Sequence, residues 1–149
     1  MAGRVEGIFI TDTKTLLPEP VERVDAIAGT GLRGNRYFYA DGGAPAGRAI
    51  TLIAAEALEA FESETGIPLS PAESRRNVLV RGIDVNALVG QRFRIGDVEC
   101  EGVQLCEPCT TLQSLTRPGV LQGMVHRAGL NADLLTTGEI AVGDTVTAE

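Results

Sequence analysis

Two cysteines three positions apart are the side chains best suited to chemistry in this sequence. They are the first and last residues of the segment Cys106–Cys109 (CEPC), in which a proline restricts the backbone between the two thiols. A thiolate can bind a soft metal, carry a sulfur atom or exchange with a disulfide. The pair could therefore be a redox dithiol, part of a metal site, or one ligand with a helper. Two buried cysteines that act only as small apolar side chains are the alternative without chemistry.

The third cysteine and the single histidine raise the number of candidate zinc ligands to four. Cys100, Cys106, Cys109 and His126 match the number that a tetrahedral zinc site needs. However, Cys100 lies in an alternating strand pattern, and the compact second ligand pair of structural zinc sites is absent from the sequence. We interpret Cys100 as an ordinary strand residue. His126 lies at the end of an expected helix, whose carbonyl end it could compensate, and we assign it no catalytic role.

Arginine supplies nearly all of the positive charge. Of 13 basic residues, only Lys14 is a lysine. Guanidinium groups bind phosphate and carboxylate through paired hydrogen bonds. Eight arginines lie between positions 33 and 94, where basic and acidic residues nearly balance although the whole chain has a net charge of −7. Compositional bias with ordinary surface ion pairs is one explanation and a local anion pocket is the other, with Ser74–Asn77 (SRRN) as its candidate.

Composition excludes several classes of protein. The chain has 149 residues, of which 44% are hydrophobic and 22% charged, as expected for one globular domain over residues 1–149. The negative net charge, the 4% aromatic content and the absence of tryptophan argue against nucleic-acid binding. No apolar run is long enough for a membrane span, and no signal-peptide pattern is present. With three cysteines and no export signal, we expect a cytoplasmic protein with free thiols and no membrane partner.

Mostly short strands must position these groups. Alternating or continuous apolar runs predict strands at 5–10, 21–27, 48–53, 78–80, 91–95, 98–105, 130–135 and 139–147. The runs 91–95 and 98–105 form an expected hairpin. Apolar positions 54, 57, 58 and 61 predict a helix that ends at Gly66, and Pro71–Arg75 predicts one helical turn. A second, shorter helix is expected over Thr116–Arg127. The absence of regular βαβ alternation predicts a mainly β fold, a small closed or partly closed barrel with two or three peripheral helices.

Six short motifs, in order, make the sequence resemble the MOSC domain family, which is named after the C-terminal domain of molybdenum cofactor sulfurase. The motifs are Gly31–Tyr37, Arg48–Ile53, Arg75–Gly82, Val89–Asp97, Cys106–Cys109 and Ile140–Asp144. Because they extend over nearly the whole chain, the sequence resembles a stand-alone, single-domain member. The resemblance implies a β-barrel with peripheral helices and molybdenum cofactor chemistry. Pyridoxal phosphate binding is also associated with the family as a whole.

The resemblance also implies roles for particular residues. Motif position assigns the molybdenum ligand, and with it the catalytic role, to Cys109, with Cys106 beside it. The molybdenum cofactor (molybdopterin) is an anionic pterin with a terminal phosphate, which arginines and backbone amides of the family bind. The matching cofactor-binding positions here are Arg33, Arg36, Arg48, Arg75 and Asn77. Many relatives carry Gly-Asp-Arg-His in the first motif. The sequence GNRY at 34–37 lacks that acid and base, which argues against acid–base chemistry there.

Two functions follow from the resemblance. The first is a molybdenum-dependent enzyme that reduces N-hydroxylated or similar N-oxygenated compounds, with electrons from a separate reductase. The second is a sulfur carrier or insertion protein, which receives a persulfide on Cys109 from a sulfur-donor protein and delivers it to the molybdenum cofactor or a metal–sulfur cluster. A binding module without turnover is a third reading, against which the retained Cys109 and Arg75–Asn77 motif argue. Exposed edge strands also make a homodimer a reasonable expectation.

Overall fold

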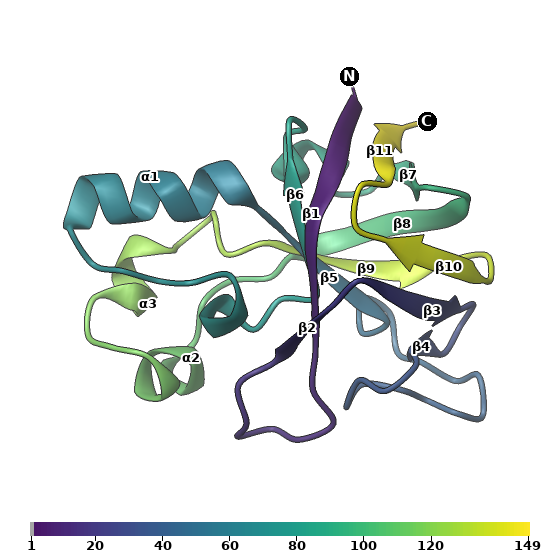
Figure 1. Cartoon of the computed structure of the whole chain (residues 1–149), viewed down its shortest axis with the longest axis horizontal. Helices are drawn as coiled ribbons and strands as arrows, with labels where there is room; N and C mark the ends of the chain where they lie inside the picture. The colour runs from purple at the N-terminus through teal and green to yellow at the C-terminus, as the bar shows by residue number, and fades with distance from the viewer. Residues whose placement is uncertain (1) are drawn as a thin grey trace.

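The computed structural model describes residues 2–149, in which eleven strands and three α-helices alternate with short turns (Figure 1). The strands are β1 (Ala2–Ile10), β2 (Glu19–Val21), β3 (Arg23–Ile27), β4 (Gly31–Leu32), β5 (Ile50–Ala54), β6 (Val78–Arg81), β7 (Arg92–Ile95), β8 (Val98–Leu105), β9 (Leu130–Leu134), β10 (Gly138–Ala141) and β11 (Thr145–Ala148). The helices are α1 (Ala55–Thr65), α2 (Thr110–Leu115) and α3 (Val120–Gly123), with 3₁₀ turns η1 (Ala72–Ser74) and η2 (Val85–Leu88).

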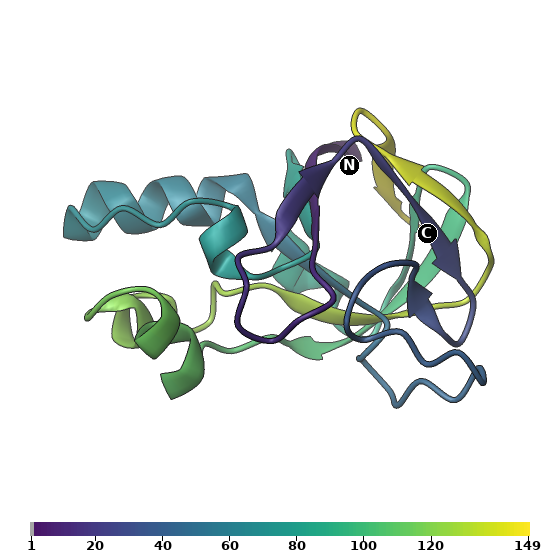
Figure 2. The same cartoon turned by 60° about the horizontal axis from the view of Figure 1, so that its bottom comes forward.

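Seven strands close into a barrel because the first and last strands pair with each other. The order around the ring is β1, β11, β7, β8, β9, β5 and β6. An eighth strand, β2, pairs with β1 outside the ring. Figure 2 shows this ring with the helices to one side. Among the strand pairs described within residues 2–149, β5–β6 alone is parallel, so it needs a crossover connection, which α1 and η1 provide.

The barrel interior is filled by the inward side of each alternating strand. Phe93 and Ile95 of β7, for example, are completely buried, whereas Arg92 and Arg94 between them are exposed. A second sheet, in the order β10, β3 and β4, contributes to the same core and therefore packs against the barrel.

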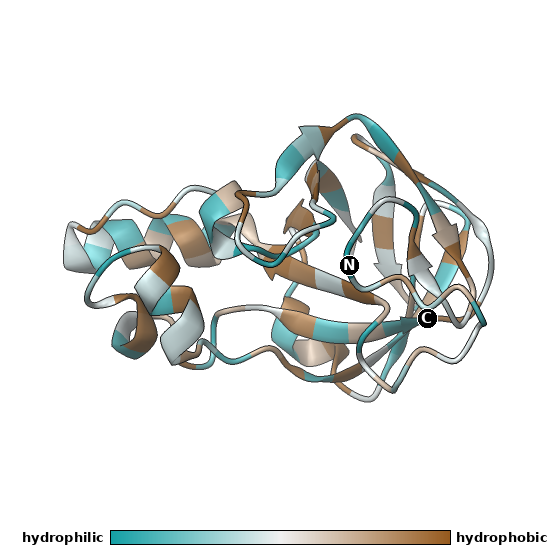
Figure 3. Ribbon diagram, turned by 90° about the horizontal axis from the view of Figure 1, so that it is seen from below, coloured by the Kyte–Doolittle hydropathy of each residue, from teal (hydrophilic) through white to brown (hydrophobic). Residues whose placement is uncertain are grey.

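The helices form a second core on the outer side of the barrel. Phe61 of α1, Leu112 of α2 and Met124 after α3 pack together with Ile53 and Leu79, which point outward from β5 and β6. Figure 3 shows the helices gathered at this side, with hydrophobic residues on helices and strands alike. None of the helices within residues 2–149 combines the length and apolar character of a membrane span.

Most sequence-based expectations for the elements are confirmed. The fold is a mainly β barrel with peripheral helices, the hairpin of β7 and β8 forms, and α1 ends at Gly66, which adopts the left-handed φ of 71°. The strand expected at 21–27 is instead divided at Glu22 into β2 and β3.

The helix expected over Thr116–Arg127 is wrong. Helix α2 begins much earlier, directly after Cys109, and α3 is only one turn long. Gly119 separates them with a φ of 96°, a left-handed conformation that a right-handed helix cannot contain. The apolar spacing that suggested a single helix reflects burial of Val120 and Met124, while Val125 is exposed.

Candidate functional site

A cavity of about 270 Å³ brings most of the candidate residues together, and we call it the thiol–arginine cavity. Thr51 of β5 and Asn131 of β9 line it and alternate with residues of the barrel core, so the cavity lies on the outside of the barrel wall. The expected site residues that line it are Arg36, Arg48, Arg75, Asn77, Cys106 and Cys109.

The three cysteines occupy three different environments. Cys109 is exposed immediately before α2, where its sulfur accepts the N–H of Leu112 at 3.4 Å. Cys106 is half-buried, and burial raises the pKa of its thiol although Arg76 and Arg48 partly oppose that effect. Cys100 points into the barrel core, where burial raises its pKa to about 12. Its interpretation as an ordinary strand residue is confirmed.

Arg36 and Arg48 reach the cavity from the loop between β4 and β5. Their guanidinium carbons lie 4.6 and 5.9 Å from the ring centroid of Tyr37, within the range of cation–π attraction. The backbone N–H of Arg36 donates to the carbonyl of Thr11 at 2.7 Å, which fixes this loop against the end of β1. Tyr37 therefore supports two cationic side chains.

Arg75 and Arg76 enter from the turn that follows η1. Arg75 donates to the carbonyls of Lys14 and Leu16 at 2.6 and 2.9 Å, so it holds the loop between β1 and β2. Arg76 donates to the carbonyls of Ala128 and Cys106 at 2.7 and 3.2 Å, so it holds the cysteine segment. Burial lowers the pKa of Arg75, and the positive charge on nearby guanidinium groups adds to this effect.

The family resemblance assigns no cofactor role to Arg76, although the SRRN segment that contains it is the candidate anion pocket of the sequence. The signal was the pair of adjacent arginines, but adjacent side chains in an extended segment usually diverge, and the sequence does not show that both reach one cavity. The left-handed turn at Arg75, with a φ of 62°, changes the direction of the chain between them.

Asn77 forms part of the cavity floor and is almost completely buried. Its side-chain oxygen accepts the N–H and the hydroxyl of Thr51 at 3.0 and 3.1 Å, and its amide nitrogen donates to the carbonyl of Phe9 at 3.2 Å. The side chain therefore ties β5, β6 and β1 together, and one amide hydrogen is left for a ligand.

The structure puts Arg33 outside the cavity. Its side chain lies 3.6 Å from a carboxylate oxygen of Asp25 and packs over the ring of Phe38. The preceding residue, Leu32, points into the barrel core, so Arg33 extends in the opposite direction to solvent. Arg33, which the resemblance assigns to cofactor binding, therefore does not line the cavity.

Glu107 is the one carboxylate among the cavity-lining residues that the structure describes. It accepts the backbone N–H of His126 at 2.6 Å, and its other oxygen lies 2.6 Å from the His126 Nδ1. Burial raises the pKa of Glu107, but these hydrogen bonds outweigh that effect and leave the pKa lowered. Residues 2–149 contain no group of three or more His, Cys, Asp or Glu side chains arranged to hold a metal.

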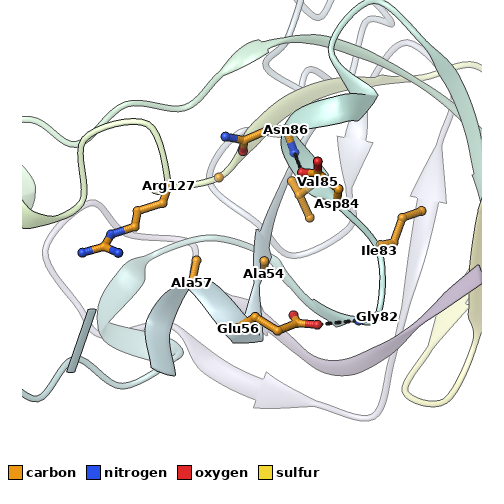
Figure 4. Close-up of a pocket in the computed structure, with 10 residues that line it drawn as sticks. Ala54, Glu56, Ala57, Gly82, Ile83, Asp84, Val85, Asn86 and Arg127 are labelled. Carbon is orange, nitrogen blue, oxygen red and sulfur yellow. Dashed lines mark hydrogen bonds between the residues drawn. The ribbon is translucent and has the colours of Figure 1, made fainter. Parts of the chain in front are cut away.

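A second depression, of about 470 Å³, lies between α1 and η2 (Figure 4). Its charged groups are already engaged, since Glu56 accepts the N–H of Gly82 at 2.8 Å and Arg127 pairs with Glu64 at 3.0 Å. No thiol or imidazole is among its lining residues within the described chain. It therefore suits an anionic or metal-bearing ligand less well than the thiol–arginine cavity.

Comparison with known proteins identifies the family. The family model described as the MOSC domain matches residues 34–147. No functionally curated protein matches the chain significantly. Among solved structures, the YuaD protein of Bacillus subtilis has a TM-score of 0.82 at 19% identity, covering 99% of this chain and 96% of that one.

Two structures of YiiM are also similar. The protein from Geobacillus stearothermophilus has a TM-score of 0.75 at 16% identity, covering 99% of this chain and 75% of its own. The protein from Escherichia coli has a TM-score of 0.70 at 17% identity, with 98% and 69% covered. At these identities the structures establish a common fold alone, whereas the family model matches most of the sequence. The chain belongs to the MOSC domain family.

Proposed function

We propose that this protein binds a molybdenum cofactor in the thiol–arginine cavity and reduces N-hydroxylated or similar N-oxygenated compounds. One observation carries the proposal, namely the distribution of ion pairs among the arginines. Eight of the chain's arginines have a carboxylate within 4.0 Å. Within residues 2–149, the arginines that lack such a partner are the four that line the cavity: Arg36, Arg48, Arg75 and Arg76.

These four guanidinium groups have no acidic partner within residues 2–149, although the whole chain has a net charge of −7. Arg36, Arg75 and Arg76 are half-buried, and charges that are partly removed from water cost free energy unless hydrogen bonds or an opposite charge compensate them. The acidic residues needed for compensation are abundant elsewhere in the chain, where they pair with the other arginines. We infer that a bound anion supplies the missing negative charge in the cavity.

The residues present fit a phosphate-ended pterin that carries molybdenum. Guanidinium groups are the preferred partners of phosphate, and a soft thiolate such as that of Cys109 is a suitable ligand for a metal already held by sulfur. The accessible Cys109 and the half-buried Cys106 both line the cavity that the four arginines line. When bound, the cofactor supplies the two-electron reduction of an N–O bond, and we propose that a separate reductase provides the electrons.

The protein's own residues hold this arrangement in place. Cys109 is fixed at the start of α2 by the N–H of Leu112, and Arg76 anchors the carbonyl of Cys106. Arg36 and Arg48 both pack against the ring of Tyr37 and both line the cavity, where their guanidinium groups are suited to phosphate. Metal binding, in this proposal, belongs to Cys109, and phosphate binding belongs to the arginines.

The exposure of Cys109 favours a second candidate function, transfer of sulfur. An accessible thiolate can take the outer sulfur atom from a persulfide on a partner protein, whose own thiolate is the leaving group. The product is a persulfide on Cys109, ready for delivery to the cofactor or to a metal–sulfur cluster. This function needs a sulfur-donor protein instead of a reductase.

Reduction of an N-hydroxylated purine tests the first function. The protein is purified from a host that makes the cofactor and is supplied with reduced methyl viologen as electron donor. We expect wild type and the core variant Cys100→Ala to consume the substrate, and Cys109→Ala to be inactive. Full activity of Cys109→Ala would refute the proposal. A radiolabelled persulfide on Cys109 in protein that holds no molybdenum would favour sulfur transfer instead.

A further inference from the structure

Four polar side chains form a row across the cavity floor. They come from four neighbouring strands or their ends: Gln104 of β8, Asn131 of β9, Thr51 of β5 and Asn77 before β6. Gln104 pairs directly with Asn131, and Asn131 pairs directly with Thr51. Directly paired residues have Cβ atoms about 5 Å apart, so their side chains are neighbours.

The two halves of this row differ in their hydrogen bonds. Thr51 and Asn77 bond to each other through side chain and backbone. Within residues 2–149, in contrast, the side-chain amides of Gln104 and Asn131 make no hydrogen bond, although both line the cavity. Every fully buried side-chain nitrogen or oxygen of the described chain does have a partner. Gln104 is exposed and Asn131 is half-buried, so both amides remain free to hydrogen-bond to a ligand in the cavity that they line.

A β-bulge gives Gln104 its position. Along β8 the inward positions are Val98, Cys100 and Gly102, so regular alternation would turn Gln104 toward the core as well. The ladder instead passes from the pair Gly102–Ala132 to the pair Gln104–Asn131, which inserts Val103 as an extra residue. This step moves Gln104 to the outer face, beside Asn131.

The loop that carries Arg48 passes closely over this pair. A Cβ atom on Gly47 would lie 3.2 Å from the Cβ of Asn131, and Gly47 has a φ of 76°. Its N–H donates to the carboxylate of Asp133 at 2.7 Å, which fixes the loop on β9. The close approach covers the stem of Asn131, while its amide still lines the cavity that Arg48 and Cys106 also line.

We propose that Gln104 and Asn131 together recognise the amide-like edge of a planar heterocycle. Each primary amide offers an N–H donor next to a carbonyl acceptor, and such side chains bind ring nitrogens and exocyclic amino groups in pairs. The inference rests on the proposed function, which offers two sources of this edge: the pterin of the cofactor and the purine of an N-hydroxylated substrate. Both share the same hydrogen-bonding chemistry.

Binding of free heterocycles to metal-free protein tests this inference. The variants are Gln104→Leu and Asn131→Leu, which remove the amides from outward positions. The matched control is Gln91→Leu, at an exposed glutamine outside the cavity. The probes are unsubstituted pterin, followed by its fluorescence, and an N-hydroxylated purine, followed by calorimetry.

We expect both cavity variants to bind at least one probe about 10-fold more weakly, as loss of one or two hydrogen bonds predicts, while the control binds like wild type. The probe that is weakened identifies the source of the edge. N-phenylhydroxylamine, which has the N–O group without the heterocyclic edge, should bind all variants equally. Circular dichroism and thermal unfolding verify that the variants are folded.

Unchanged affinity for both probes in folded variants would overturn the inference, and so would a wild-type protein that binds neither. These outcomes are separate from the fate of the proposed function. If wild type holds no molybdenum but its binding of heterocycles depends on the two amides, the proposed function is refuted and amide recognition stands. If wild type holds molybdenum but the variants bind both probes normally, amide recognition is refuted and the proposed function stands.

Discussion

At the scale of single residues, the surroundings of each thiol decide what it can do. Cys100 lies in the barrel core, Cys106 in the wall of the cavity, and Cys109 at its open edge. The thiolate is the reactive form of cysteine, and burial disfavours it. The three residues should therefore differ in reactivity in the order of their exposure.

Alkylation by iodoacetamide should reveal this order. At about pH 8, folded protein should be modified first at the exposed Cys109, more slowly at Cys106, and not at Cys100. Because burial raises the pKa of Cys106, its modification should accelerate as the pH rises above the ordinary thiol pKa. Peptide mass spectrometry over time measures the three rates, and rapid modification of Cys100 in folded protein would contradict the structure.

The cavity arginines make a second prediction at this scale. Arg48 has no carboxylate partner within the described residues, whereas Arg92 lies 3.8 Å from Glu99. Arg48→Gln should weaken binding of inorganic pyrophosphate by about 10- to 100-fold, since a charge-assisted hydrogen bond contributes roughly 1.5–3 kcal/mol. Arg92→Gln, the matched control, should bind like wild type. Calorimetry measures both affinities, and equal weakening in the two variants would indicate a general effect of net charge.

At the scale of elements, short segments position the cysteines. Helices α2 and α3 cover Phe61, and Arg117 connects the turn between them to Glu73 of η1, with a nitrogen–oxygen distance of 2.7 Å. The same turn η1 leads directly into Arg75 and Arg76. The thiol side and the arginine side of the cavity are thus joined by one ion pair outside it.

The ion pair of Glu73 predicts a dependence of stability on pH. Hydrogen bonds from Arg117 lower the pKa of Glu73, in spite of opposing burial. The stabilisation is therefore complete above the ordinary carboxyl pKa and is lost as the pH falls through the lowered value. Glu73→Gln should reduce Tm near pH 7, and its difference from wild type should shrink below about pH 4. A difference in Tm that stays constant on acidification would argue against the pair.

The break between α2 and α3 predicts a cost for a side chain at Gly119. Its φ of 96° is strained for any other residue, and a Cβ there would lie 2.5 Å from Ile67 Cδ1. Gly119→Ala should lower the free energy of unfolding by about 1–2 kcal/mol. Gly43→Ala, in an exposed loop without positive φ, serves as the control. Urea denaturation compares the stabilities of the two variants. A Gly119→Ala variant as stable as wild type would contradict the break at Gly119 and support the continuous helix expected from the sequence.

At the scale of the whole molecule, the periodicity of the sequence predicts the barrel, but it does not predict which way every side chain points. Alternation and turn residues are local signals, so they indicate the strands, α1 and the hairpin of β7 and β8. The directions of the Arg33 and Arg76 side chains depend on how the chain turns in the folded structure. The outward position of Gln104 depends on a one-residue bulge, which reverses a strand's faces without a mark in the sequence pattern.

Charge is also arranged at the scale of the molecule. The net charge of −7 opposes binding of long polyanions such as nucleic acid. The four cavity arginines form a local positive field beside the exposed thiol of Cys109 and the half-buried thiol of Cys106. Such a separation suits one small anion and excludes large ones, which agrees with a phosphate-ended cofactor as the proposed ligand.

Molybdenum content most directly tests whether the thiol–arginine cavity holds a molybdenum cofactor through Cys109. Wild type, Cys109→Ala and the core control Cys100→Ala are purified from a cofactor-producing host, and bound molybdenum and released pterin are measured by mass spectrometry and fluorescence. We expect about one molybdenum and one pterin per chain in wild type and Cys100→Ala, and loss of the metal in Cys109→Ala. Wild type without molybdenum, or Cys109→Ala with as much as wild type, would contradict this expectation.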